Sequence, residues 1–153
     1  MLYRLAGLIR RLRPGSRLRR VLLDEAFRRS FRAVSRKDVE TPLLFFEPDC
    51  ETRFVGAFVP GMRERYHGHD GYREWAYEWF EEWGVQQIAP AEMIDLGDRL
   101  VVRLRAVARG SASGAEVAWE LGYVYRLSPR GRVAQLDMYS DWPQALEAAG
   151  LRA

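Results

Sequence analysis

Residues 115–140, AEVAWELGYVYRLSPRGRVAQLDMYS, indicate the fold more clearly than any other part of the chain. Apolar and polar residues alternate on both sides of Ser128-Pro129-Arg130-Gly131, and a period of two is typical of strands with one buried face. Serine, proline and glycine favour a turn between the two strands. Asp141-Trp142-Pro143 then precedes a helical pattern over residues 144–151. The end of the chain therefore predicts an antiparallel pair of strands closed by a helix.

Two more strands are expected before this pair. Period-two segments at 86–96 and 99–109 are separated by Gly97-Asp98, and a Gly- and Ser-rich turn follows the second one. The first half of the chain is mainly helical in pattern, with a helix after Ser16, a short helix near residues 41–46, a strand at 51–55 and a helix over 71–83. This order predicts an α+β fold, a curved antiparallel sheet wrapped around helices.

Alternation also separates the two faces of the predicted sheet, and the apolar, ring-bearing face is expected to point inward. Tyr72, Trp75, Trp79 and Trp83 follow helical spacing and are expected to line the same interior. Because a buried hydroxyl needs a partner, Tyr123 is the first choice for ligand contact, although a backbone carbonyl would serve it equally well. The predicted ligand-binding residues are Trp75, Trp79, Leu104, Trp119, Tyr123, Tyr125, Leu136 and Met138. The same rings could instead simply fill the core.

Charge divides the chain of 153 residues unevenly. Residues 1–20 contain seven arginines and no acid, so the remainder is mildly acidic despite the formal net charge of +3. Pro14-Gly15 separates this segment, and we expect residues 1–15 to form a flexible basic extension to one domain at 16–153. We expect neither nucleic acid nor a membrane surface as its partner. The extension lacks the uninterrupted apolar run of a secretory signal, and the single Cys50 fits a reducing cytoplasm.

His67, His69 and Asp70 resemble metal ligands in type. The chain has only these two histidines, however, and a stable site usually needs three or four protein ligands. We therefore expect no metal and no cofactor. Either histidine is expected to orient the loop at the pocket mouth, and His69 is retained as a weak candidate for a general acid or base.

Three short motifs occur in an informative order: His67-Gly68 with Gly71 at a helix entry, the turn at 95–98, and the ending from Tyr139 to Leu151. With them, residues 18–151 resemble the SnoaL-like branch of the nuclear transport factor 2-like superfamily. The resemblance implies a cone-shaped sheet with an internal pocket, closed by three helices. It also implies a homodimer formed through the outer sheet face.

The resemblance gives no complete catalytic set. Counting back from Gly131 places Tyr123 at the oxyanion-donor position of ketosteroid isomerase-like enzymes, but Arg53 stands where the base is required, and arginine does not act as that base. The water-activating residues of limonene epoxide hydrolase-like enzymes are replaced by Leu104, Ala106 and Met138. Asp137, the nearest acid for cyclase chemistry, points outward by parity. Tyr123, Arg53 and His69 are thus weak catalytic candidates.

Two functions remain open at this point. The chain is either a pocket protein for a small apolar or aromatic molecule, with or without isomerase, cyclase or hydrolase activity, or a non-catalytic dimerising module. A cavity of about 300 Å³ or more in which Tyr123 and Arg53 converge favours the first. A cone filled by its own rings favours the second.

Overall fold

The computed structural model describes residues 2–55, 62–110 and 112–152, and the side chains from residue 4 onward within them. Its helices are α1 (Leu2–Arg11), α2 (Arg17–Ser35), α3 (Glu40–Leu43), α4 (Gly68–Tyr77) with a π-helical continuation η1 (Glu78–Glu82), and α5 (Trp142–Ala148). The strands are β1 (Phe46–Val55), β2 (Arg65–His67), β3 (Val85–Asp95), β4 (Arg99–Arg109), β5 (Glu116–Leu127) and β6 (Val133–Tyr139). No described helix is long and apolar enough to cross a bilayer.

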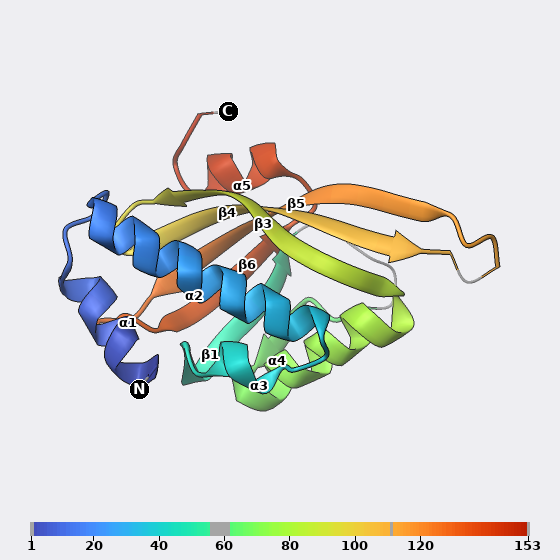
Figure 1. Ribbon diagram of the computed structural model, residues 1–153, viewed down its shortest axis with the longest axis horizontal. Helices are drawn as coiled ribbons and strands as arrows, with labels where there is room; N and C mark the ends of the chain where they lie inside the picture. The colour runs from blue at the N-terminus through green and yellow to red at the C-terminus, as the bar shows by residue number, and fades with distance from the viewer. Residues whose placement is uncertain (1, 56–61, 111, 153) are drawn as a thin grey trace.

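The six strands form one curved sheet in the order β2-β1-β6-β5-β4-β3. All neighbours are antiparallel except β1 and β6, which run parallel. Helices α2, α3 and α4 cover the inner face, and α5 lies on the outer face (Figure 1). The α+β prediction of a curved sheet around helices is confirmed, and the four predicted strands of the second half match β3 to β6 closely. The strand at 51–55 is longer than expected, and β2 falls partly in a region expected to be a loop.

The first helix of the predicted domain begins where the sequence indicates. The Ser16 side chain accepts a hydrogen bond from the backbone N–H of Arg19, so Ser16 caps α2. Leu23, Phe31 and Val34 then point to the core because they recur at helical spacing. This stripe places α2 across the open side of the sheet.

The aromatic helix differs from its prediction at both ends. It begins at Gly68, three residues before the predicted start, and Asp70 pairs with Arg73 within the helix. At its other end the chain widens into the π-helix η1, which adds a residue to the turn. Trp75 and Trp79 are buried, but Trp83 is rotated outward and is 37% exposed. The expected four-ring stripe therefore ends at Trp79.

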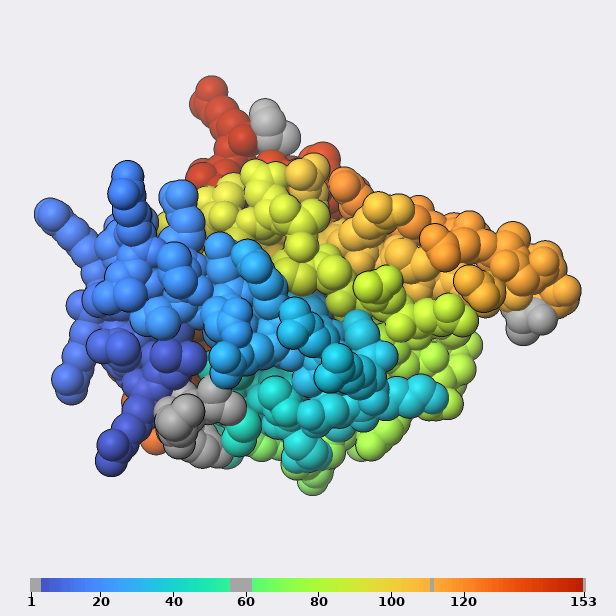
Figure 2. Space-filling model, in the orientation of Figure 1, coloured from blue at the N-terminus to red at the C-terminus, as the bar shows by residue number. Residues whose placement is uncertain are grey.

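Residues 2–11, expected to be flexible, form α1, which packs on one end of the domain (Figure 2). Ala6 and Ile9 of α1 are buried. Arg19 holds the helix in place, because its guanidinium donates to the carbonyls of Ile9 and Leu12 and pairs with Asp95 at 2.7 Å. The arginine-rich helix α1 is therefore part of the folded structure, because Ala6 and Ile9 pack against the domain.

Two glycine turns provide the surface on which this end packs. A Cβ atom on Gly131 would lie 2.5 Å from the Ala6 carbonyl oxygen, and one on Gly97 would lie 3.1 Å from the Pro14 ring. Both glycines also have positive φ angles, which favour residues without a Cβ atom. The turns thus bring the sheet end close to α1 and to the link that follows it.

Candidate functional site

The inner sheet face carries the residues that alternation assigns to it. Leu104, Tyr123, Tyr125, Leu136 and Met138 are each at most 5% exposed. Trp119 is partly buried and packs against the same core. The register explains this grouping, because Tyr123 lies opposite Met138 and Tyr125 lies opposite Leu136 on neighbouring strands. With Trp75 and Trp79, all eight predicted ligand residues share one core, while ligand contact by each stays a prediction.

The aromatic rings form a continuous layer between α4 and the sheet. Trp75 lies 5.1 Å from the ring of Tyr72 and 6.4 Å from that of Trp79, and Trp79 meets Trp119 edge to face at 6.3 Å. Tyr123 and Tyr125 are 6.3 Å apart on the sheet side. Such tilted contacts are favoured for aromatic pairs and hold the rings in defined positions.

Three polar atoms inside this layer have no hydrogen-bond partner among the described residues. They are the Tyr123 hydroxyl, the Trp75 indole Nε1 and the Thr52 hydroxyl, and all three residues are at most 1% exposed. Burial raises the pKa of Tyr123 and Tyr125 well above the ordinary phenol value. The phenols therefore stay protonated and can donate hydrogen bonds. An unpaired buried donor costs roughly 1–3 kcal/mol, so each of these atoms favours an incoming acceptor.

Among the described residues, the interior shows a hollow of about 60 Å³, which Tyr125 lines but the three unpaired donors do not. Ala6 and Ile9 of α1 close one side, and rings of Phe27, Phe31, Phe46, Tyr72 and Tyr125 contribute to the others. This volume is well below the roughly 300 Å³ of a typical small-molecule pocket. The cone is therefore nearly filled by its own side chains in this conformation.

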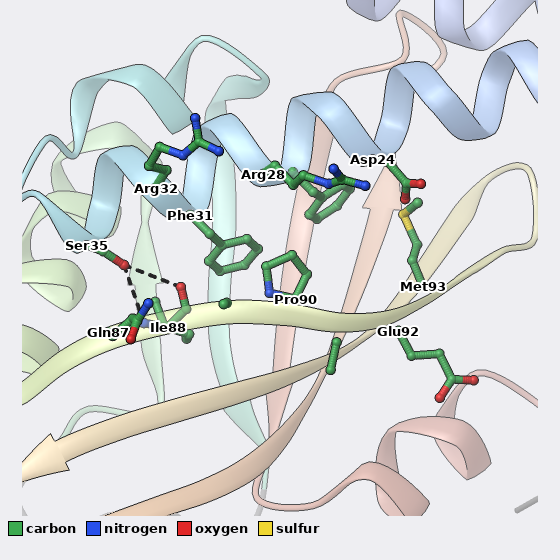
Figure 3. Close-up of a pocket in the computed structure, with 13 residues that line it drawn as sticks. Asp24, Arg28, Phe31, Arg32, Ser35, Gln87, Ile88, Pro90, Glu92 and Met93 are labelled. Atoms are coloured by element: carbon green, nitrogen blue, oxygen red, sulfur yellow. Dashed lines mark hydrogen bonds between the residues drawn. The ribbon is translucent and has the colours of Figure 1, made fainter. Parts of the chain in front are cut away.

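A second and larger concavity of about 500 Å³ lies between α2 and the edge strand β3 (Figure 3). Its lining includes Arg28 and Arg32 of α2 and Pro90 and Met93 of β3, and the Ser35 hydroxyl bonds to the backbone of Ile88 at one end. None of the eight predicted ligand residues lines it. Phe27 and Phe31 line both this groove and the interior hollow, so two side chains separate the two spaces.

Arg53 does not enter the interior, so the convergence with Tyr123 that would favour the pocket protein is not observed. Its guanidinium lies on the outer face and donates to Asp137 at 2.6 and 2.9 Å. The side chain of Asp137 is 1% exposed and also accepts from Gln135. Hydrogen bonding to Asp137 raises the pKa of Arg53 further. The alternation of Cys50, Thr52 and Phe54 on the inner face leaves Arg53 outside, and Asp137 points outward as its parity indicates.

The histidines belong to the entry of α4. His69 Nε2 lies 3.3 Å from the carbonyl oxygen of Phe46, and His67 Nδ1 lies 2.9 Å from Glu51. Both contacts link the start of α4 to β1. Among the described residues no group of three His, Cys, Asp or Glu side chains is arranged to hold a metal ion.

Reactive groups are scarce near the unpaired donors. The buried carboxylates of the described chain are Glu47 and Asp137, and both have partners: Glu47 accepts from the Ser128 hydroxyl at 2.6 Å, and Asp137 pairs on the outer face. Burial raises the pKa of the Cys50 thiol to about 11, so it carries no thiolate at neutral pH. The interior can donate hydrogen bonds, but its described residues supply no carboxylate base.

Several site residues were not singled out from the sequence. Phe27 and Phe31 recur at helical spacing on α2, but their position on the walls of two hollows depends on how β3 packs against this helix. Thr52 could have been found, because alternation with Phe54 places it on the inner face. Tyr72 was expected in the aromatic stripe, and its contact with Phe46 at 4.9 Å depends on a long-range pairing.

A curved sheet around three helices with an aromatic interior defines a nuclear transport factor 2-like fold. The chain belongs to the SnoaL-like domain family, whose sequence profile matches residues 27–136. A search of curated proteins finds no matching relative.

Solved structures share the fold at low sequence identity. TerC, co-crystallised with polyporic acid, is 21% identical, with a TM-score of 0.61 and coverage of 83% of this chain and 95% of TerC. A protein of unknown function from Burkholderia pseudomallei K96243 is 23% identical, with a TM-score of 0.61 and coverage of 80% and 93%. A candidate SnoaL-like polyketide cyclase from Jannaschia sp. CCS1 is 17% identical, with a TM-score of 0.62 and coverage of 82% and 87%. These identities establish the fold and leave the ligand open.

Proposed function

We propose that this protein binds a small apolar or aromatic molecule with a hydrogen-bond acceptor, such as a carbonyl group, inside the cone. The observation that supports this proposal best is the Tyr123 hydroxyl, which is fully buried and unpartnered among the described residues. The Trp75 indole N–H adds a second group, which can donate a hydrogen bond but cannot accept one. The ligand would therefore supply an oxygen acceptor and bury its apolar part against the rings.

Entry would use the groove between α2 and β3. Phe27 is partly buried and stacks on Phe31 at 6.1 Å while its edge meets Tyr125 at 5.0 Å. Rotation of these two rings would join the 500 Å³ groove to the 60 Å³ hollow. Tyr123 lines neither space, but Tyr125 on the wall of the hollow lies 6.3 Å from it, so the ligand would also have to pass the Tyr125 ring. The joined space would fall in the size range of small-molecule sites. This ring movement makes a filled cone compatible with binding.

The proposed activity is binding and orientation, with no reaction assigned. A protonated Tyr123 would polarise a ligand carbonyl as an oxyanion donor does. Proton abstraction would need a base, and no described carboxylate lies beside the unpaired donors. Isomerase, cyclase or hydrolase chemistry thus has weaker support than binding. We place this activity in the cytoplasm, where the single thiol of Cys50 needs no disulfide partner.

A matched pair of ligands tests the role of Tyr123. Tetralone and tetralin have the same ring system, and only tetralone carries a carbonyl. A compound at a hundred times its Kd raises the free energy of unfolding by about 2.7 kcal/mol, so thermal shifts report binding. Tyr123→Phe is expected to weaken tetralone binding about five- to tenfold, the value of one hydrogen bond, and to leave tetralin binding unchanged.

Tyr139→Phe is the control, because Tyr139 is an outer-face tyrosine packed against the residues of α5. It should leave both affinities unchanged. A wider screen of apolar and aromatic carbonyl compounds accompanies the pair. If none of these compounds stabilises the wild type, the proposal of an internal ligand site fails.

The alternative is a non-catalytic dimerising module of the same fold. The near-filled interior favours it, because a hollow of about 60 Å³ leaves little room without ring movement. A homodimer through the outer sheet face would be its expected form. Sedimentation equilibrium of the full chain tests this, and a monomer at all concentrations would contradict it.

A further inference from the structure

One end of the molecule carries a concentrated positive charge. We call it the basic end and define it by six exposed arginines of α1, its following turn and the start of α2: Arg4, Arg10, Arg11, Arg13, Arg17 and Arg20. None of the six forms an ion pair with an acid among the described residues. The first acid along the chain is Asp24. Long side chains project from this end of the molecule (Figure 2).

Apolar side chains are exposed among these arginines. Leu8 of α1 is 47% exposed, and Leu18 and Val21 of α2 are 55% and 62% exposed. Leu8 lies four residues after Arg4 and three before Arg11, so the three share one helix face. Leu18 and Val21 share a face of α2 by the same spacing. Each helix therefore presents leucine or valine beside arginine on its outer side.

The inner sides of both helices are fixed to the domain, which sets them apart from a flexible basic tail. The buried Arg19 joins α1, α2 and the β3–β4 turn through Asp95, Ile9 and the Gly97 carbonyl. Arg10 also donates to the Ser128 carbonyl at 3.1 Å. The arginines thus lie on helices that are already folded, so binding a partner does not require the helices to fold.

We propose that the basic end docks on an anionic lipid bilayer. Arginines near such a surface each strengthen binding about fivefold, and apolar side chains between them enter the interface. From the sequence we expected no membrane partner, because residues 1–15 were predicted to form a flexible extension. In the structure Leu8, Leu18 and Val21 lie outside while Ile9 and Leu23 lie inside. The two helices would lie on the membrane surface without crossing it, with Leu8, Leu18 and Val21 as their apolar contacts.

A nucleic acid is the competing partner for such a charge. Single-stranded binding usually adds aromatic side chains on which bases stack. Among the side chains that the structure describes, the large exposed aromatics are Tyr77 and Trp83, which lie on α4 and after η1, beside Glu78, Glu81 and Glu82. Exposed aliphatic residues at the basic end favour lipid over nucleic acid.

Vesicle binding of the full chain tests the proposal without any pocket ligand, so it is independent of the proposed function. The wild type should sediment with phosphatidylcholine vesicles that contain phosphatidylserine and stay in solution with phosphatidylcholine alone. Added salt should weaken the binding, because it screens exposed charges. Arg4→Gln with Arg11→Gln should lower the partition coefficient about 25-fold.

Two further variants make the result specific. Arg28→Gln with Arg32→Gln also removes two positive charges, but from the part of α2 that lines the groove. Because these arginines lie outside the basic end, the partition coefficient should change little. Leu8→Ser keeps every charge and should still weaken vesicle binding several-fold. Circular dichroism confirms that the variants fold. The proposal fails if the wild type does not bind anionic vesicles at low salt. It also fails if the control pair lowers the partition coefficient as much as Arg4→Gln with Arg11→Gln does. A third contrary result is single-stranded RNA binding that is tighter than vesicle binding and is unchanged by Leu8→Ser.

Discussion

The most deeply buried polar side chains on the two faces of the sheet differ in their hydrogen bonding. On the outer face, Asp137 is almost fully buried and receives hydrogen bonds from Arg53 and Gln135. On the inner face, Tyr123 and Thr52 are equally buried and have no partner among the described residues. Folding alone therefore explains the outer polar groups. The inner ones are better explained by a molecule that the interior receives.

The end of the cone that α1 covers resembles the outer face, because its least exposed charged side chains are paired. Arg19 is buried and Asp95 is 11% exposed at its side chain, and Arg19 satisfies its remaining donors with backbone carbonyls. The charges of Arg19, Asp95 and Asp137 are thus paired, while the Tyr123, Thr52 and Trp75 donors inside have no partner among the described residues. Substitutions at both kinds of position can test this difference.

Asp95→Asn is expected to cause the largest loss of stability. It leaves the guanidinium of Arg19, which is 3% exposed, buried without a counter-charge. Removal of one partner from such a pair costs roughly 3 kcal/mol, measured by urea unfolding at neutral pH. Asp98→Asn lies in the same turn, is 71% exposed at its side chain, and should cost less than about 0.5 kcal/mol. Equal losses would show that Arg19 does not depend on Asp95.

The same pair predicts a loss of stability in acid. Burial alone would raise the pKa of Asp95, but hydrogen bonds from Arg19, Gly97 and Gly15 outweigh it and hold the pKa below the ordinary 3.8. The unfolded chain therefore binds the proton more readily, and stability rises with pH in this range. The stabilisation is complete above pH 3.8 and is lost as the pH falls through the lowered pKa. The difference between wild type and Asp95→Asn should shrink over the same interval, and a constant difference would contradict this origin.

Asp137→Asn should rank second. It leaves Arg53, 29% exposed at its side chain, and Arg126, 42% exposed, close together without their shared carboxylate. Because both arginines reach solvent, the expected cost is smaller, about 2 kcal/mol by urea unfolding. Glu120→Gln is the control, since Glu120 is 56% exposed and lies 3.8 Å from Arg103. A neutral Asp137→Asn would remove the contrast between the two faces.

A pair of glycine variants tests how α1 closes the interior. Gly131 and Gly150 both have φ near +80°, so alanine at either position should cost roughly 1–2 kcal/mol of backbone strain. Only at Gly131 would the new Cβ atom meet α1, 2.5 Å from the Ala6 carbonyl oxygen, whereas Gly150 faces open space. Gly131→Ala should lose about 1 kcal/mol more. Trypsin should also cleave it faster after Arg10 and Arg11, and equal cleavage of both variants would show that α1 does not depend on this contact.

Local patterns predicted much of this architecture, and long-range contacts account for the errors. Period-two alternation placed Tyr123, Leu136 and Met138 inside and Asp137 outside, because strand geometry allows no other arrangement. Arg53 was assigned to the interior by resemblance, although alternation with Thr52 opposes it. The parallel pairing of β1 with β6 and the packing of α1 against Gly131 join residues far apart in sequence, and no local period records them.

The smallest expected effect bears most directly on the site. Tyr123→Phe removes a buried hydroxyl that has no partner, so the free energy of unfolding should stay unchanged or rise by up to about 1 kcal/mol. Tyr66→Phe is the matched control, because its equally buried tyrosine donates to Glu78, and it should lose about 1 kcal/mol. If both variants lose stability alike, the Tyr123 hydroxyl is satisfied in the folded protein, and the inner face no longer differs from the outer one. If the hydroxyl serves binding, Tyr123→Phe should differ in a second way: the variant gains stability without ligand and binds tetralone more weakly. The hydroxyl would then destabilise the free protein and stabilise the complex. That result would identify it as a binding group, because a hydroxyl kept for folding would not behave in this way.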